Sequence, residues 1–328
     1  MREYFGSMFD DRYGFPGYFS LHCCPTCGQL QTVPLLIDKD LPALYSNFYP
    51  RREIDIGALQ RAVGNPGSFT EAVRRWMAGT DNQGQYVARP GMAVLDYGCG
   101  AGQSLLELKK LGAEAYGLEA DPNVQQVADA LGLRIHIGTI DDNPFPGVMF
   151  DLIVLNQVLE HIPQPERLLT KLASRLRAGA VVVFSVPNCA SFYRHYYDRS
   201  WINWHVPYHL HHFNPNSIRR FFSRHGWRVA SLRTVTPNLW TILQIRAAVE
   251  CTKMGVPNPM WTGQAHSEED KRRFDSVVPS RLKKMLYNLV LSANRPVQKI
   301  MFPIWNRSID ATGYGDSILV VAKPGPSK

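Results

Sequence analysis

The chain has 328 residues, of which 45% are hydrophobic and 20% charged, and its formal net charge is +8. This length suffices to bury a large core, so we expect one main domain with additions. No apolar run approaches the ~18 residues that a membrane-spanning helix requires, so we expect no transmembrane segment, although peripheral contact with a membrane stays open. The first eleven residues carry acids where a signal peptide would be apolar, which predicts a cytoplasmic protein.

The positive net charge indicates which partners are electrostatically favoured. It attracts anionic ligands in general, such as a nucleotide-linked sugar, a lipid-linked intermediate or a membrane surface. The basic residues are dispersed along the sequence, and no helix-turn-helix, zinc-finger or RNA-binding sheet signature accompanies them. A nucleic acid is therefore disfavoured as the partner, and a small-molecule, sugar-linked or lipid-linked ligand is favoured.

Residues 1–68 form an N-terminal module that is rich in aromatic residues, glycine and proline and ends in a Gly-Asn-Pro-Gly linker. Cys24 and Cys27 form a C-x-x-C pair, which is half of a four-ligand zinc site. No second pair follows, so a four-coordinate zinc would need His22, Cys23 or a distant ligand. We favour a degenerate knuckle without metal over bound zinc.

Residues 69–235 alternate between helical and strand patterns. Such alternation predicts an α/β fold, with a parallel sheet covered by helices on both faces. Gly179 precedes an alanine and three valines and is expected to start their strand. The expected helices are 69–79, 102–111, 123–131, 164–176 and 215–225, and the expected strands are 93–97, 114–119, 134–137, 150–155, 180–186 and 227–234.

The most informative segment follows the first of these strands and contains Asp96, Gly98, Gly100 and Gly102. Glycines let the backbone turn sharply and pass close to a ligand, and the following helix offers its free N–H groups. The dinucleotide fingerprint G-x-G-x-x-G would need a glycine in place of Gln103, so the loop departs from the pattern of NAD-binding proteins. It resembles the first motif of class I S-adenosylmethionine-dependent methyltransferases, in which this loop contacts the methionine part of the cofactor.

Later strand ends match further motifs of this family in the same order. Glu119 ends a strand about 20 residues after the loop, where a carboxylate can accept hydrogen bonds from both ribose hydroxyls. Asp121 precedes a proline and is interpreted as the N-cap of the next helix. The resemblance implies further cofactor contacts after the third and fourth strands: Thr139 and Ile140 beside the adenine, and Asn156 and Gln157 in the fourth motif.

Residues 201–213 contain four histidines, which raises the possibility of a metal site. Their Pro-x-His-Leu-x-x-Phe core resembles a substrate-side segment of ubiquinone-biosynthesis-like methyltransferases. His209 is our first candidate for general base, because a histidine near neutral pKa can remove a proton from a hydroxyl. His161, which follows the fourth strand, is the second, and for each the alternative is a histidine hydrogen-bonded in a packed loop. The resemblance also implies substrate contacts from Trp204, His205 and Tyr208.

The remaining chain completes the expected fold. Residues 236–312 are interpreted as a helical insertion, with the clearest helical pattern at 281–291. Residues 313–328 would form the closing strand and tail, because 315–323 resembles the last, antiparallel strand of these methyltransferases. We therefore expect a Rossmann-like, doubly wound sheet of seven mostly parallel strands.

The resemblance implies a function as well as a fold. It predicts transfer of a methyl group from S-adenosylmethionine to a small-molecule or sugar-type acceptor, with a hydroxyl oxygen favoured and no metal required. Two alternatives stay open. One is a non-catalytic module of the same fold that binds a cofactor or a partner, and the other is an NAD(P)-dependent oxidoreductase.

Overall fold

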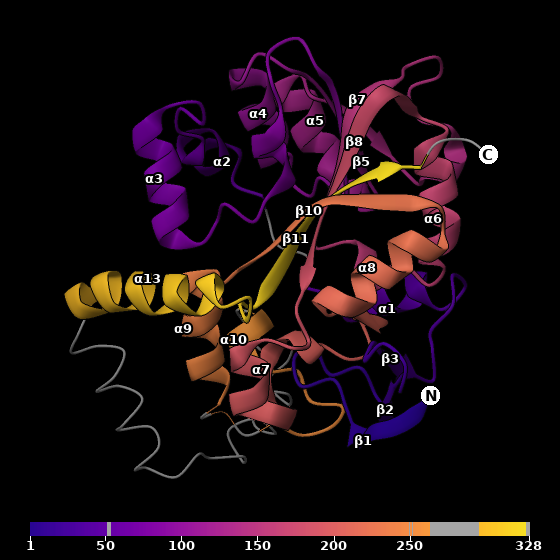
Figure 1. Ribbon diagram of the computed structural model, residues 1–328, viewed down its shortest axis with the longest axis vertical. Coiled ribbons are helices and arrows are strands. Elements are labelled where there is room, and N and C mark those ends of the chain that lie inside the picture. Colours follow the sequence, from indigo (N-terminus) through magenta and orange to yellow (C-terminus); the bar gives the residue numbers. More distant parts are fainter. Residues whose placement is uncertain (51–53, 249, 251, 263–294, 326–328) are drawn as a thin grey trace.

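A computed structural model describes residues 1–50, 54–248, 250, 252–262 and 295–325 (Figure 1). Within these residues, seven strands form one sheet in the order β10-β11-β8-β7-β4-β5-β6. Neighbouring strands from β8 to β6 are parallel, and β11 runs antiparallel to both β8 and β10. The doubly wound, mostly parallel sheet is thus confirmed. Its strands are β4 (Ala93–Tyr97), β5 (Glu114–Glu119), β6 (Arg134–Ile137), β7 (Phe150–Asn156), β8 (Leu176–Pro187), β10 (Trp227–Val235) and β11 (Ser317–Pro324).

The sheet is buried on both faces, and strand β7 illustrates this. Ile153 and Leu155 belong to one hydrophobic cluster, whereas Leu152 and Val154 belong to another. Successive side chains of a strand point to opposite faces, so a strand buried on both faces reads as a continuous apolar run. Helices α6 (Pro165–Ala173) and α8 (Pro215–Arg224) complete the first cluster, and α4 (Gln103–Lys110) completes the second.

The helices of this domain begin and end close to their predicted positions, with one exception before β8. The predicted helix 164–176 ends at Ala173, and the following strand begins at Leu176 rather than at Gly179. The prediction was wrong because the backbone N–H of Phe150 donates to the carbonyl of Arg175, which draws residues 175–176 into the ladder. The other helices near this sheet are α3 (Phe69–Ala78) and α5 (Gln125–Leu131).

The N-terminal module contributes three strands to a second, smaller sheet of order β1-β2-β3-β9. Its strands are β1 (Arg2–Met8), β2 (Phe19–Cys23) and β3 (Leu30–Val33). They are joined by β9 (His211–His212) from the histidine-rich segment 201–213, which follows α7 (Phe192–Tyr197). The antiparallel pairing of β3 with β9 fixes the module against the histidine-rich segment. The module also contains the short helices α1 (Leu41–Asn47) and α2 (Ile56–Ala62).

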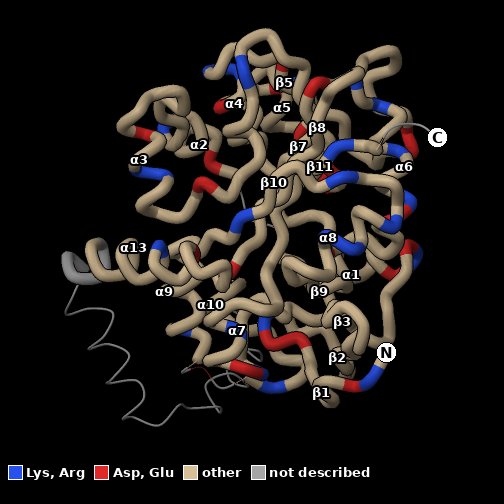
Figure 2. Tube along the Cα trace, viewed as in Figure 1, with Lys and Arg blue, Asp and Glu red and all other residues tan. Residues whose placement is uncertain are grey.

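The region between β10 and β11 is helical where it is described. Helices α9 (Asn238–Ala247), α10 (Pro259–Thr262) and α13 (Arg295–Ala311) lie there, and α13 packs against β10, α3 and α9 (Figure 1). The predicted helix 281–291 lies outside the described residues. Among the helices that are described, none is long and apolar enough to cross a membrane. Lys and Arg are spread over several elements, and α8 and β10 carry arginines without any Asp or Glu (Figure 2).

Candidate active site

The glycine loop lies where the strand order of the large sheet reverses, between β4 and β7. In open α/β sheets, ligands bind at this switch point, beyond the carboxyl ends of the strands. Gly98 and Gly102 have φ angles of +76° and +79°, and a Cβ added at either would approach a neighbouring side chain to 2.7 or 2.8 Å. A Cβ at Gly100 would meet nothing within 4 Å, so the loop is open on that side.

Two carboxylates flank this loop. One oxygen of Glu119 accepts a hydrogen bond from the Gly100 N–H at 2.8 Å, and the other accepts from the N–H groups of Ala120 and Asp121. A carboxylate has about four acceptor positions, so Glu119 keeps one for a ligand. Asp96 is buried, accepts from the Ser104 hydroxyl, and has a second oxygen without a hydrogen-bond partner among the described residues. The orphaned oxygen and the open glycine loop fit a polar nucleoside-type ligand.

The side chains of Asp121 and of the other predicted cofactor-binding residues already make contacts within the protein. Asp121 accepts from the Asn123 N–H and caps the following 3₁₀ turn, which confirms the capping interpretation. Thr139 likewise caps the turn 140–142 through its side chain. The Asn156 amide is held by Gly84 and Gln85, and the Gln157 amide donates to Ser185 and Ser317. Ile140 packs against the main core.

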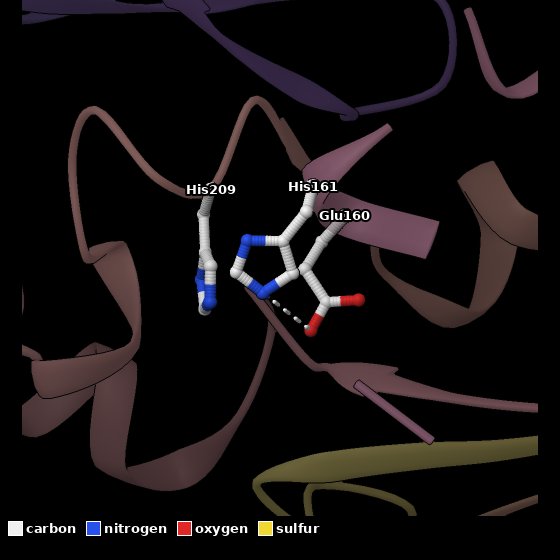
Figure 3. A group of neighbouring side chains, drawn as sticks. All are labelled: Glu160, His161 and His209. Carbon is white, nitrogen blue, oxygen red and sulfur yellow. Dashed lines mark ion pairs between the residues drawn. The ribbon is translucent and has the colours of Figure 1, made fainter. Parts of the chain in front are cut away.

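The two candidate bases lie side by side. His161 follows β7 and His209 lies in the loop before β9, with ring centroids 4.7 Å apart (Figure 3). The Nδ1 atom of His209 is 2.8 Å from the carbonyl of Asn203, and Nδ1 of His161 is 2.9 Å from the carbonyl of Tyr208. A carbonyl can only accept, so each Nδ1 carries the proton and each Nε2 presents a lone pair.

Burial keeps both imidazoles neutral. It lowers the pKa of His161 to about 4 and that of His209 well below its ordinary value. Transfer of a charged imidazolium out of water is unfavourable, which is the cause of both shifts. Both rings are therefore uncharged in the neutral pH range, with Nε2 available as an acceptor or a metal ligand. The near-neutral pKa expected for a histidine base was wrong, because burial makes both rings weaker bases than a free imidazole.

Glu160 completes this group. Its side chain is 1% exposed, and neither carboxyl oxygen has a hydrogen-bond partner among the described residues. Burial raises its pKa to about 8, so the carboxyl is protonated at neutral pH. One oxygen lies 4.0 Å from Nε2 of His161, and the ligand atoms of Glu160, His161 and His209 all lie within 4.8 Å of one another (Figure 3). This geometry could also hold a metal ion, a possibility that the sequence placed on a different set of histidines.

The N-terminal module supplies a tyrosine to the same place. The hydroxyl of Tyr45, in α1, lies 3.1 Å from Nδ1 of His161. Burial raises the pKa of Tyr45, and the charges of Glu160 and Glu119 add to this effect. Tyr45 therefore brings the N-terminal module into direct contact with the histidine pair. Sequence reasoning missed Tyr45 and Glu160, although Tyr45 lies in the aromatic-rich N-terminal module and Glu160 directly precedes His161.

The remaining aromatic candidates are buried around these groups. Tyr208 stacks on His205 with ring centroids 4.8 Å apart, and both residues are less than a tenth exposed. Trp204 is 1% exposed, and its indole N–H donates to the carbonyl of Asp198. His212 instead contacts the hydroxyl of Thr32 at 3.1 Å, so it helps to hold β3.

Cys24 and Cys27 lie apart from this group. Both are half-buried free thiols, and hydrogen bonds from Cys27 and Thr26 lower the pKa of Cys24 to about 7. Across the described part of the chain, the one cluster of three side chains that could hold a metal is Glu160, His161 and His209. A metal-free knuckle stays our prediction for this pair.

Comparison with known proteins identifies the larger domain. Residues 69–232, half of the chain, match the family described as methyltransferase domain. The chain belongs to this family. Its methyltransferase domain thus contains the glycine loop, Glu119 and both candidate bases, whereas Tyr45 and Thr32 lie outside the matched residues.

The individual relatives match this chain at low sequence identity and over part of its length. The chain is 30% identical to the ubiquinone biosynthesis O-methyltransferase of Xanthomonas campestris pv. campestris over 110 residues, which cover 31% of this chain and 46% of the relative. The enzyme of the same name from Coxiella burnetii is 29% identical over 110 residues, 32% and 47% of the two chains. The match thus spans about half the length of these curated relatives. Coclaurine N-methyltransferase, solved with N-methylheliamine and SAH, is 14% identical, with a TM-score of 0.48 over 88% of this chain and 84% of that one.

Proposed function

We propose that this protein is an S-adenosylmethionine-dependent methyltransferase that methylates a hydroxyl oxygen of a small-molecule or sugar-type acceptor. The observation that carries the proposal is the placement of a neutral histidine pair beside a glycine loop that lies at the switch point of the sheet. Membership of the methyltransferase domain family supports the cofactor, and two relatives named as O-methyltransferases support oxygen as the acceptor atom.

The cofactor side is assigned to residues of the methyltransferase domain. The open loop at Gly98–Gly102 would hold the methionine end, with the orphaned oxygen of Asp96 near it. Glu119 would accept from a ribose hydroxyl through its remaining acceptor position. Thr139 and Ile140 are the candidates for the adenine side. When bound, S-adenosylmethionine supplies an electrophilic methyl group on a sulfonium centre.

The protein's own contribution on the other side is orientation and proton removal. His209 holds its proton on Nδ1 through the Asn203 carbonyl, which leaves Nε2 free to accept the proton of an acceptor hydroxyl. His161, fixed by the Tyr208 carbonyl, is the second base. The surrounding aromatic rings exclude water and position the acceptor, and positioning lowers the barrier of an in-line displacement.

Calorimetry with S-adenosylmethionine, S-adenosylhomocysteine and NAD tests the cofactor assignment. We expect micromolar binding of the first two and none of NAD, because the loop lacks the third fingerprint glycine. Binding of NAD without S-adenosylmethionine would contradict the proposal and favour an oxidoreductase. Labelled S-adenosylmethionine incubated with the protein and a metabolite extract should then yield a labelled product. Cofactor binding without any labelled product would favour a non-catalytic module.

A further inference from the structure

The N-terminal module holds a buried cation that the proposed mechanism does not use. Arg12, in the loop after β1, is 8% exposed. Its guanidinium stacks 4.0 Å above the ring of Trp261, and one terminal nitrogen donates to the carbonyl of Ile202. Arg12 also forms an ion pair with the 45% exposed side chain of Asp11, whose oxygen is 4.0 Å from Nε, beyond hydrogen-bond distance. The Nε–H of Arg12 is left without a hydrogen-bond partner among the described residues.

The loop that presents Arg12 is held rigidly. The carboxylate of Asp10 is fully buried and accepts from the backbone N–H groups of Arg12, Tyr13 and Phe15 at 2.9–3.0 Å. In return, the Arg12 carbonyl accepts from the Asn258 N–H at 2.7 Å. Such a turn fixes both the cation and the neighbouring Tyr13, so their positions result from several independent bonds.

Two further polar atoms close to this loop are buried and unpartnered. They are Nε2 of His205 and the hydroxyl of Tyr208, and neither has a hydrogen-bond partner within the described ranges. The rings of His205 and Tyr208 stack on each other, and Tyr13 contacts both, with ring centroids 5.5 and 5.3 Å away. Tyr49, which is 41% exposed, contacts Tyr13 and Tyr208 and is the member of this group that reaches solvent.

A buried polar group without a partner costs free energy, and a buried charge costs more. Here three donor groups lie around the ring of Tyr13: a guanidinium N–H of the preceding residue, and a phenol O–H and an imidazole, which can carry its proton on Nε2, of the two rings that Tyr13 contacts. Burial lowers the pKa of His205 well below its usual value, and the charge of Arg12 lowers it further. Arg12 also lowers the pKa of His161 and His209, though less than burial does. The buried carboxylate of Asp10 lies in the same region but already accepts from three backbone N–H groups. The polar groups of this region left without partners among the described residues can all act as donors, which favours an anion over a second cation.

We propose that Arg12, His205 and Tyr208 bind an anionic oxygen group, a carboxylate or a phosphate, on the methyl acceptor. This inference rests on the proposed function and names the acceptor class for the same site. The anion would pair with Arg12 and accept from His205 and Tyr208. The ring of His205 is 4.9 Å from that of His209, so an acceptor held in this way has its hydroxyl side close to the candidate base.

The test compares charged and neutral small aromatic probes on the full chain saturated with S-adenosylhomocysteine. Benzoate, phenyl phosphate and the neutral benzamide are titrated by calorimetry and by thermal shift. We expect benzoate or phenyl phosphate to bind and benzamide to bind at least about tenfold more weakly, since a charge-assisted hydrogen bond is lost. Whichever of benzoate and phenyl phosphate binds more tightly indicates whether the site prefers a carboxylate or a phosphate. Equal binding of benzamide and the anions, or no binding of either anion, would overturn the proposal.

Variants locate the binding. Arg12→Gln should weaken the preferred anion at least about tenfold, with the affinity for S-adenosylhomocysteine unchanged. Arg75→Gln is the matched control, because Arg75 is 9% exposed, lies 4.0 Å over the Tyr86 ring and donates to the Pro66 carbonyl, away from this site. Should Arg12→Gln not fold, Tyr208→Phe removes one hydroxyl only and is expected to weaken the anion several-fold. Unchanged anion affinity in the folded Arg12→Gln or Tyr208→Phe variant contradicts the proposal.

The same titrations separate this inference from the proposed function. If S-adenosylhomocysteine itself does not bind, the function fails whatever the anions do. If it binds and the anions do not, the anionic acceptor alone is refuted.

Discussion

The two halves of the candidate active site are built in opposite ways. The cofactor side is assembled from one stretch of chain, in which Asp96, the glycines and Glu119 lie at consecutive strand ends of a parallel sheet. The acceptor side gathers Arg12 and Tyr45 from the N-terminal module, Glu160 and His161 from the end of β7, and His209 from a later loop. A site of the first kind can change its ligand contacts one residue at a time. In the second kind, we expect acceptor binding, proton transfer and docking of the module to be coupled.

The largest expected effect is on the acceptor side. His209→Ala should lower turnover by at least about tenfold and by up to about 10⁴-fold, while the affinity for S-adenosylmethionine stays unchanged. His211→Ala is the control, because its ring contacts the Pro163 carbonyl, at 3.4 Å, and the ring of Phe213. If activity per folded molecule persists and the melting temperature falls, His209 is a packing residue and His161 becomes the leading base.

Glu119→Ala should affect the cofactor side alone. We expect the dissociation constant for S-adenosylmethionine to rise by the equivalent of about 1–3 kcal/mol, because a charged acceptor is removed. Turnover at saturating cofactor should change little. Glu114→Ala, at the exposed start of the same strand, is the matched control. An unchanged dissociation constant, measured by calorimetry, would move the ribose contact to another carboxylate.

Glu160→Gln tests the buried carboxyl through pH. The folded-state pKa of Glu160 is raised from 4.5 to about 8, so its contribution to stability is fully present below pH 4.5 and is lost as the pH rises through 8. Glu160→Gln removes this pH-dependent contribution. The free energy of unfolding of the variant minus that of the parent should therefore increase between pH 5 and pH 8, by more than about 1.4 kcal/mol. Urea unfolding at several pH values measures it, with the surface change Glu166→Gln as control. A difference independent of pH would show that Glu160 does not titrate in this range.

Thr32→Val tests the coupling of the module to the histidines. The buried Thr32 hydroxyl donates to the His209 carbonyl at 2.6 Å and contacts Nε2 of His212. Its loss should lower the free energy of unfolding by about 1–2 kcal/mol and reduce turnover without changing cofactor affinity. Thr170→Val, where the hydroxyl is exposed, is the control. Unaltered stability and turnover would show that the module docks without this bond.

The smallest effect is expected at the cysteine pair. Purified protein should carry well under one zinc per chain, and Cys24→Ser with Cys27→Ser should melt as the parent does. Stoichiometric zinc that is lost in this double variant would reveal distant ligands and a structural metal site, because structural zinc contributes folding free energy.

Local patterns predicted the methyltransferase domain closely. The apolar run at β7 and the alternation of helices and strands determined the sheet, because burial on both faces leaves a continuous hydrophobic signal. The strand boundary at Gly179 was missed because a ladder bond from Phe150, far along the chain, decides it. The pairing of β3 with β9 has no comparable sequence signal. The two residues of β9 are too few to show the alternation of apolar and polar side chains that marks a strand.

The sequence by itself determined the parallel sheet, the glycine loop and Glu119, since these depend on the spacing of neighbouring residues along the chain. Only the tertiary structure decided that Glu160, Tyr45 and Arg12 meet the histidines, and that the carbonyls of Asn203 and Tyr208 set their tautomers. The physical reason is that desolvation and pairing of buried polar groups depend on what surrounds them in space. Some of those surroundings come from far along the chain: Tyr45 is 116 positions from His161, and Arg12 is 190 positions from the Ile202 carbonyl to which it donates.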